Sequence, residues 1–230
     1  MSHFLLAVLH EEWQDVDELL EPYSEQLETE PRLKYTKAEA IQHGREHYKE
    51  LAGKTDEECW KFMADGYTTD EDGNIYTTYN PLSKWDYYDV GGGWDGYLKL
   101  KNGERSNSAQ IKDIDFSSGK EDYQKSLRFW DVVVEHAPAK PEEKYFSLYN
   151  EKYFRDFYGD RETYARRQTM FSTFAVITPD GKWYECGHMG WWGISSETPE
   201  TSADWHDHYF ERFIQNIAPN LIMTIVDCHI

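Results

Sequence analysis

The sequence predicts an α+β fold of the ferredoxin-like kind, in which two split β-α-β units form one sandwich and a large α/β segment is inserted between them. The chain begins and ends with short, continuous apolar runs, at residues 4–9 and 221–226, and such runs are typical of strands buried on both faces. Each run lies near a helical pattern and a further strand pattern, so each end has the order of a β-α-β unit. In a ferredoxin-like sheet the first and last strands are antiparallel neighbours, so we expect these two runs to pair.

The N-terminal unit is predicted to cover residues 1–35. After the first strand, residues 15–20 have a short helical pattern that Pro22 stops, because proline lacks the N–H that a helix needs. Residues 27–35 alternate weakly between apolar and polar and contain Pro31. Proline cannot donate to a strand ladder, so this segment is predicted to be an edge strand at most.

The C-terminal unit is predicted to cover residues 170–230. Residues 172–184 form the clearest hairpin pattern, with the turn Thr-Pro-Asp-Gly at 178–181. Thr198 followed by Pro199 is a typical helix start. The helix would place an apolar stripe against the sheet. The stripe consists of Trp205, Tyr209, Phe213 and Ile217, which recur at every fourth position.

Residues 36–169 are interpreted as an inserted segment of helices and strands. Thr36 with Glu39, and Thr55 with Glu58, are capping boxes that each begin a short helix. The remaining patterns predict a hairpin at 67–79, a strand at 94–100, and helices at 120–135 and 142–158. No composition typical of a linker separates these elements, so we predict one domain that spans residues 1–230.

The charge balance excludes several classes of partner. The 230 residues include 24 Lys and Arg against 43 Asp and Glu, a formal net charge of −19. Direct binding to nucleic acid or to an anionic membrane is not expected, because phosphate binding requires clustered cations. The charge favours a partner protein with a basic surface.

The acidic residues concentrate in three segments, at 11–30, 46–72 and 198–211. If these segments share one face, they form a surface that would compete with nucleic acid for a basic groove. Glu57, Glu58 and Asp65 represent this candidate acidic surface. The alternative is that the acids are scattered and serve only solubility.

The cysteines and the N-terminus indicate the compartment. Cys59, Cys186 and Cys228 are a small and odd set, which opposes a disulfide framework and favours a reducing environment. The first ten residues are too short an apolar run to span a membrane, and they lack the features of a signal peptide. We therefore expect the protein in the cytoplasm.

Two boxes rich in aromatic residues and glycine are candidate binding sites. Stacking on the rings, together with backbone N–H groups of consecutive glycines, would suit a planar or anionic small ligand. The alternative is that the boxes pack in the core. The candidate residues are Trp85, Asp86, Tyr88, Gly91, Gly92 and Trp94 in the first box and Trp191 and Trp192 in the second.

The place where the two terminal strands meet is a candidate metal site. Antiparallel pairing brings His3 near Asp227, Cys228 and His229, and we consider His3, Cys228 and His229 as zinc ligands. Strand alternation sends Cys228 and His229 to opposite faces, which opposes a shared ion. The alternative is hydrogen-bonded structural histidines. No His-Glu-x-x-His, serine hydrolase or P-loop signature is present, so no cofactor is predicted.

Together these boxes resemble an uncharacterised family of phage and prophage proteins. The shared features are Met-Ser-His-Phe at 1–4, Asn-Pro-x-Ser-Lys-Trp-Asp and the following Gly-Gly-x-Trp at 80–94, Asp-Ile-Asp-Phe at 113–116, Met-Gly-Trp-Trp-Gly at 189–193 and Val-Asp-Cys-His-Ile at 226–230. The chain departs from the family at Gly93, where the family usually has Arg, and at Tyr87, where it usually has Trp. The resemblance implies an accessory protein of a mobile element inside a bacterial cell.

Two functions are consistent with these observations. The first is a non-enzymatic, acidic binding protein that acts on a host factor, as an inhibitor of a defence complex or of a nucleic-acid-handling complex. The second is a metal-dependent enzyme or small-ligand-binding protein that uses the edge of the sheet at His3 and His229 together with the aromatic-glycine boxes. A tightly bound stoichiometric metal would favour the second function, and salt-sensitive binding to a basic protein would favour the first.

Overall fold

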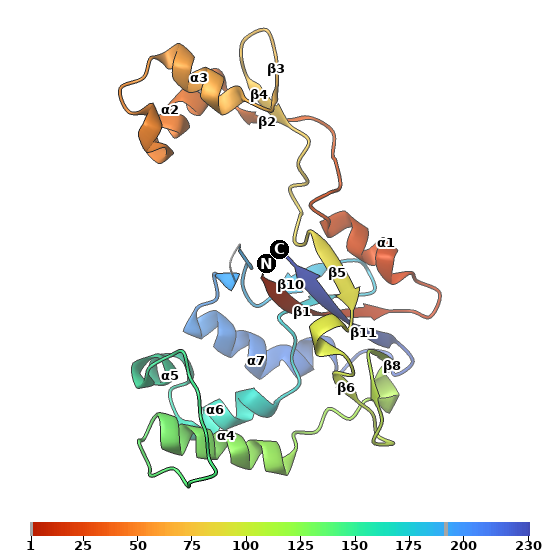
Figure 1. Cartoon of the computed structure of the whole chain (residues 1–230). Helices are drawn as coiled ribbons and strands as arrows, with labels where there is room; N and C mark the ends of the chain where they lie inside the picture. Colours follow the sequence, from red (N-terminus) through yellow and green to blue (C-terminus); the bar gives the residue numbers. More distant parts are fainter. Residues whose placement is uncertain (1, 191–192) are drawn as a thin grey trace. The chain divides into compact units, whose positions relative to one another are not determined.

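The computed structural model describes residues 2–190 and 193–230 of the chain. These residues form two compact units (Figure 1). The larger unit contains Met1–Glu21 and Lys84–Ile230, and the smaller unit contains Pro22–Ser83. Both units contain helices and strands, so the predicted α+β class is confirmed.

A mixed sheet forms the centre of the larger unit. Its strands follow the order β10-β9-β1-β11-β5, and β8 pairs with the remaining part of β11. The strands are β1 (His3–His10), β5 (Tyr87–Val90), β8 (Ser108–Gln110), β9 (Ala175–Ile177), β10 (Trp183–Glu185) and β11 (Ile222–His229).

The two terminal strands are neighbours in this sheet. β1 and β11 pair antiparallel from His3 opposite His229 to His10 opposite Ile222. Nearly all residues of β1 and β11 are buried. This agrees with their continuous apolar sequences, which are typical of strands covered on both faces. The predicted pairing of the first and last strands is therefore confirmed.

Helix α7 (Pro199–Phe213) supplies the cover for one face of the sheet. Thr198 caps it in a capping box, and Pro199 is its first residue. Its Trp205, Tyr209 and Phe213 are buried in one cluster with alternate residues of β1 and β11. These three residues of the predicted stripe pack the helix against the sheet, whereas Ile217 lies beyond the end of α7 and is only partly buried against the same cluster.

The pairing of β1 with β9 differs from the ferredoxin-like expectation. β1 pairs with β9 in parallel, whereas neighbouring strands of a ferredoxin-like sheet are antiparallel. Parallel neighbours need a long crossover connection, and the chain between β1 and β9 is long enough to provide one. The hairpin predicted at 172–184 is present as β9 and β10.

The smaller unit combines two helices with a short sheet. Helices α2 (Lys37–His47) and α3 (Asp56–Ala64) begin at the predicted capping boxes of Thr36 and Thr55. The sheet has the order β2 (Arg32–Tyr35), β4 (Ile75–Thr77) and β3 (Thr68–Thr69). A 3-10 turn, η2 (Lys49–Leu51), lies between the helices.

The boundaries of the predicted insertion differ from the observed arrangement. The segment 27–35, expected beside the first strand, forms β2 and pairs with β4 in the smaller unit. Conversely, the expected insertion 36–169 contributes β5 and β8 to the main sheet, where both pair with β11. Local strand patterns do not specify a partner strand, which explains both differences.

Three further helices of the larger unit form an aromatic cluster. Its core is Trp130, Val134, Phe154 and Tyr164. Trp130 lies on α4 (Lys120–Val133), and Val134 caps the end of that helix. Phe154 lies on α5 (Glu151–Tyr158) and Tyr164 on α6 (Arg161–Thr169). The helix expected at 142–158 begins only at Glu151, where Asn150 caps it. Within the described residues, no helix is both long and apolar enough to cross a membrane.

Candidate metal centre at the ends of the terminal strands

The pairing of β1 with β11 brings three potential metal ligands together at one end of the main sheet. His3 is directly opposite His229 in the register, and Asp227 lies two positions before His229 on β11. Because side chains alternate between faces along a strand, Asp227 and His229 share a face. The three side chains offer ligand atoms that all lie within 4.8 Å of one another.

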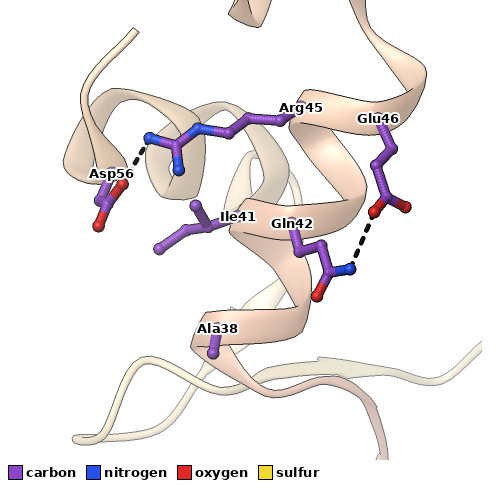
Figure 2. Close-up of a pocket in the computed structure, with 6 residues that line it drawn as sticks. All are labelled: Ala38, Ile41, Gln42, Arg45, Glu46 and Asp56. Atoms are coloured by element: carbon purple, nitrogen blue, oxygen red, sulfur yellow. Dashed lines mark hydrogen bonds and ion pairs between the residues drawn. The ribbon is translucent and has the colours of Figure 1, made fainter.

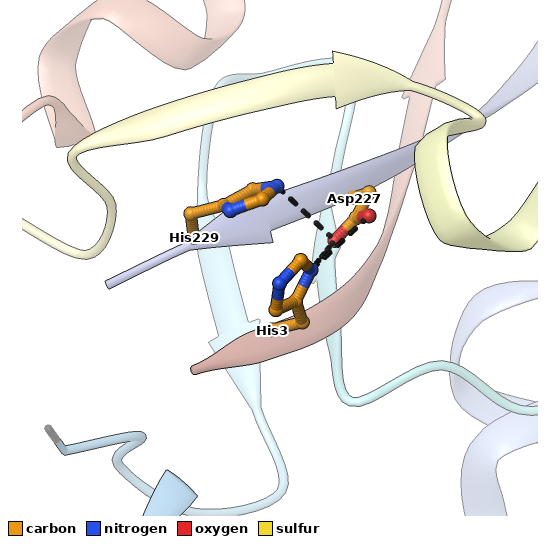
Figure 3. A group of neighbouring side chains, drawn as sticks. All are labelled: His3, Asp227 and His229. Atoms are coloured by element: carbon orange, nitrogen blue, oxygen red, sulfur yellow. Dashed lines mark hydrogen bonds and ion pairs between the residues drawn. The ribbon is translucent and has the colours of Figure 1, made fainter. Parts of the chain in front are cut away.

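The Asp227 carboxylate contacts both imidazoles from one side (Figure 3). Its carboxylate oxygens accept from His3 Nδ1 at 3.2 and 3.3 Å. The Oδ1 atom also lies 3.8 Å from His229 Nε2. The two imidazole rings are tilted, with centroids 3.9 Å apart. One carboxylate oxygen, Oδ1, is therefore close to both rings.

The 3-10 turn η3 (Gly92–Trp94) holds the Asp227 carboxylate from the other side. The Asp227 side chain is only 3% exposed, so its charge needs partners inside the protein. Gly93 N–H donates to Oδ2 at 2.8 Å. A Cβ atom at Gly92, whose φ is +50°, would lie 2.6 Å from Asp227 Cβ. Only glycine at position 92 lets the backbone of the turn come this close to Asp227. The close contact fixes the orientation of the carboxylate.

Gly91 attaches the same turn to the sheet. Its N–H donates to Ile225 O at 2.9 Å, and a Cβ atom at Gly91 would lie 2.3 Å from the Asn107 side chain. The closest neighbours of the Cβ positions of Gly91 and Gly92 are the side chains of Asn107 and Asp227, so this turn packs directly against one of the three potential metal ligands.

His229 occupies a nearly buried position at the end of β11. Its side chain is 11% exposed, and the Tyr87 ring of β5 packs edge-on against it at a centroid distance of 5.0 Å. A hydrogen bond to Asp89 raises the pKa of Tyr87, so this phenol stays protonated. His229 Nδ1 is buried and has no hydrogen-bond partner among the described residues. Leaving such an atom unsatisfied costs about 1–3 kcal/mol.

Two imidazoles and one carboxylate are a donor set suited to Zn²⁺ and other first-row divalent ions. Metal–ligand bonds of about 2.0–2.2 Å place adjacent ligand atoms roughly 3–3.5 Å apart. The distance of 3.2 Å between His3 and Asp227 fits this range, and the 3.8 Å to His229 exceeds it slightly. The His3 side chain is 47% exposed, which leaves its ring room to turn toward an ion. Three protein ligands leave at least one coordination position open.

Cys228 is excluded from this group, although the sequence suggested it as a ligand. It lies between Asp227 and His229 on the strand, so its side chain points to the opposite face. There it is fully buried, and burial raises the pKa of its thiol. A protonated thiol is a poor metal ligand. Asp227 takes the place that we expected for Cys228, and the two-residue period of a strand is the sequence signal that favours it.

The first aromatic-glycine box serves partly as core. Trp85 is 9% exposed and packs edge-on against Tyr88 at a centroid distance of 4.9 Å, in agreement with the alternative that the box packs in the core. Trp94 is only partly buried against the main core. Asp86 N–H donates to His229 O at 3.0 Å, which connects the start of β5 to the metal ligands.

Tyr88 links the box to helix α1 (Val16–Leu20). Its hydroxyl donates to Asp17, and burial raises its pKa. Trp191 and Trp192 of the second box lie outside the described residues. A ligand pocket built by both boxes therefore stays a prediction.

The residues that represented the acidic surface lie in the smaller unit, where two of them are paired. Glu57 lies 3.3 Å from Lys61 Nζ and 3.9 Å from Lys37 Nζ. Glu58 belongs to the Thr55 capping box and also contacts Lys54 Nζ at 3.4 Å. Asp65 is exposed at the end of α3. Much of the charge at Glu57 and Glu58 is thus neutralised locally.

The smaller unit also contains an open pocket of about 450 Å³ between α2 and α3 (Figure 2). Arg45, its one basic residue, donates to Asp56 across the pocket. This pairing holds the guanidinium in place and neutralises it, so Arg45 offers little positive charge to a ligand. The lining residues are Ala38, Ile41, Gln42, Arg45, Glu46 and Asp56.

No protein-family model, curated protein or solved structure matches the chain. The chemistry of the His3, Asp227 and His229 group is therefore the main guide to function.

Proposed function

We propose that this protein binds a divalent transition-metal ion through His3, Asp227 and His229 and that the ion holds a small oxygen-containing ligand at its open positions. Mixed nitrogen and oxygen donors favour Zn²⁺ and similar ions, whereas Mg²⁺ and Ca²⁺ prefer oxygen donors alone. A metal ion in such a site acts as a Lewis acid toward the ligand that it binds.

The observation that carries this proposal is the environment of the buried Asp227 carboxylate. Its described partners are two imidazoles and the Gly93 N–H, and none of them is Lys or Arg. A buried carboxylate needs a compensating positive charge. An ion held by the adjacent imidazoles would supply that charge.

The test is a calorimetric titration of the metal-free full chain with Zn²⁺. We expect Asp227→Asn and His229→Ala each to weaken binding at this site by about tenfold or more, by analogy with changes around metal ligands in general. The matched control is His208→Ala, since His208 is an exposed histidine of α7 whose Nδ1 contacts Asp204 O. Equal Zn²⁺ affinity in the wild type, Asp227→Asn and His229→Ala would contradict the proposal.

A second proposed function rests on the distribution of charge. We propose that the chain is a phage- or prophage-encoded, non-enzymatic protein that acts in the host cytoplasm on a factor with a basic groove, such as a defence complex. Residues 1–21 and 85–98 contain no Lys or Arg, and the hydrogen bond from Tyr88 to Asp17 joins these two segments. Their acidic residues are Glu11, Glu12, Asp15, Asp17, Glu18 and Glu21, with Asp86, Asp89 and Asp95.

This second function predicts salt-dependent binding to a host protein. Affinity capture from a host lysate, followed by mass spectrometry, would identify the partner. Binding of the purified partner should weaken as salt rises, because exposed charges are screened beyond roughly 8–10 Å at physiological ionic strength. Reversal of Glu12, Asp15 and Glu18 to Lys should slow association. Binding that is indifferent to both salt and charge reversal would oppose this function.

A further inference from the structure

A second pair of histidines lies on helix α2 of the smaller unit. His43 and His47 are four residues apart, so their side chains share one helix face. Their ring centroids lie 4.2 Å apart, and the rings are tilted by 42°. Tyr35 of β2 stacks on the His43 ring at 5.0 Å, which limits the orientation of that imidazole. His47 is exposed, so an ion can reach the pair from solvent.

We propose that His43 and His47 chelate a second divalent transition-metal ion, such as Zn²⁺, independently of the site on the terminal strands. Two histidines at positions i and i+4 are the arrangement by which helical zinc motifs hold their ion. Residues 43–47 are His-Gly-Arg-Glu-His, the reverse of the His-Glu-x-x-His order.

The position of the pair along α2 also favours a cation. His47 is the last residue of the helix. The final carbonyl groups of a helix carry the negative end of its dipole, and this stabilises positive charge in the last turn. The pair therefore combines two nitrogen donors with a local field that attracts a divalent ion.

Glu46 has no catalytic role in this proposal, although catalytic zinc motifs use a glutamate at this place. Gln42 Nε2 donates to the Glu46 carboxylate at 2.8 Å (Figure 2). Two imidazoles are also fewer protein ligands than the three of a typical catalytic zinc site. The site is a two-histidine chelate whose remaining coordination positions are taken by water.

The test starts from the full chain carrying His3→Asn and His229→Asn, which removes the terminal site. Zn²⁺ titration of this parent by calorimetry should still show one binding event. Adding His47→Asn should weaken that binding by about tenfold or more, because the second arm of a chelate multiplies the affinity of the first. Unchanged Zn²⁺ affinity after His47→Asn, with helical content preserved by circular dichroism, would overturn the proposal.

A composition-matched variant separates chelation from binding to single imidazoles. Gln42→His combined with His43→Gln keeps the number of histidines but places them five residues apart, roughly 140° around the helix. Chelation predicts that this variant binds Zn²⁺ as weakly as the His47→Asn variant. Affinity equal to that of the parent would overturn the proposal. Binding at the terminal site is measured separately, by comparing Zn²⁺ binding of the wild type with Zn²⁺ binding of the parent.

Discussion

Gly92 is the glycine that touches the candidate metal centre most directly. Its φ is +50°, and a Cβ atom at this position would lie only 2.6 Å from Asp227 Cβ, so there is no space for a side chain. At the residue scale, the orientation of one carboxylate therefore depends on the absence of a side chain at a neighbouring residue. Mutation of the groups that orient metal ligands commonly lowers metal affinity by about 10–100-fold.

The first prediction concerns Gly92→Ala. The added methyl group should displace the Asp227 carboxylate and weaken Zn²⁺ binding by about 10–100-fold although all three ligands remain. The control is Gly103→Ala, because Gly103 has a φ of +90° and nothing within 4 Å of its Cβ position. Both variants carry backbone strain, but only the first should lose metal in a calorimetric titration. Equal losses would show that strain alone, and not contact with Asp227, controls the site.

Two tryptophans with opposite exposure give the second prediction. Trp85 is 9% exposed and Trp13 is 82% exposed. Trp85→Ala should lower the free energy of unfolding by about 3–5 kcal/mol, because it leaves a cavity in the core. Trp13→Ala should change it by only about 0.5 kcal/mol. Urea unfolding measures both values. Near-native stability of the Trp85 variant would show that this side chain is part of a recognition surface and not of the core.

Among the elements, an ion pair connects helix α4 to the irregular segment that follows it. Arg128 of α4 binds Glu143 through Nε at 2.9 Å and Nη2 at 2.7 Å. Glu143 belongs to the irregular segment between α4 and α5, and Lys140 N–H also donates to it at 2.8 Å. These hydrogen bonds, chiefly that of Arg128, lower the pKa of Glu143 to about 2. The pair therefore holds this segment against the helix.

The third prediction is the pH dependence of this ion pair. A carboxyl group whose pKa falls on folding stabilises the folded state above its unfolded pKa. Glu143→Gln should therefore destabilise the protein at neutral pH, and the difference from the wild type should shrink as pH falls from about 4.5 toward about 2. The neighbouring exposed residue provides the control, Glu142→Gln. A pH-independent difference in unfolding free energy would mean that Glu143 acts through packing and not through its charge.

At the scale of the whole chain, the candidate metal centre joins the two ends of the larger unit. Ser2 N–H donates to Ile230 O at 3.1 Å, and Ile230 N–H donates to Ser2 O at 3.2 Å. The ligands directly beside these bonds come from residue 3 and from residues 227 and 229. An ion at this position would connect the terminal strands, and it could bind only after those strands had paired.

The fourth prediction follows from this linkage. A ligand that binds only the folded state raises the free energy of unfolding by about 2.7 kcal/mol at a concentration of 100 times its dissociation constant. Zn²⁺ should therefore raise the melting temperature of the wild type more than that of the variant with His3→Asn and His229→Asn. Differential scanning fluorimetry measures both shifts. Identical shifts would place the stabilising ion elsewhere in the chain.

The amino-acid sequence was enough to predict the features that depend on neighbouring residues. The capping boxes at Thr36 and Thr55, the helix start at Thr198 and Pro199, the hairpin of β9 and β10 and the first three residues of the apolar stripe of α7 all form as predicted. Each depends on hydrogen bonds or periodicity within a few residues. The continuous apolar runs at both ends also predicted the antiparallel pairing of β1 with β11.

Which distant segments pair with one another depends on the three-dimensional path of the chain. The parallel pairing of β1 with β9, and the placement of β2 in the smaller unit, depend on the path of long connections, and strand propensity carries no information about that path. The same holds for the site. The two-residue period of β11 indicates that Asp227 and His229 share a face, but the contact of Gly92 and Gly93 with the Asp227 carboxylate exists only because β5 lies beside β11.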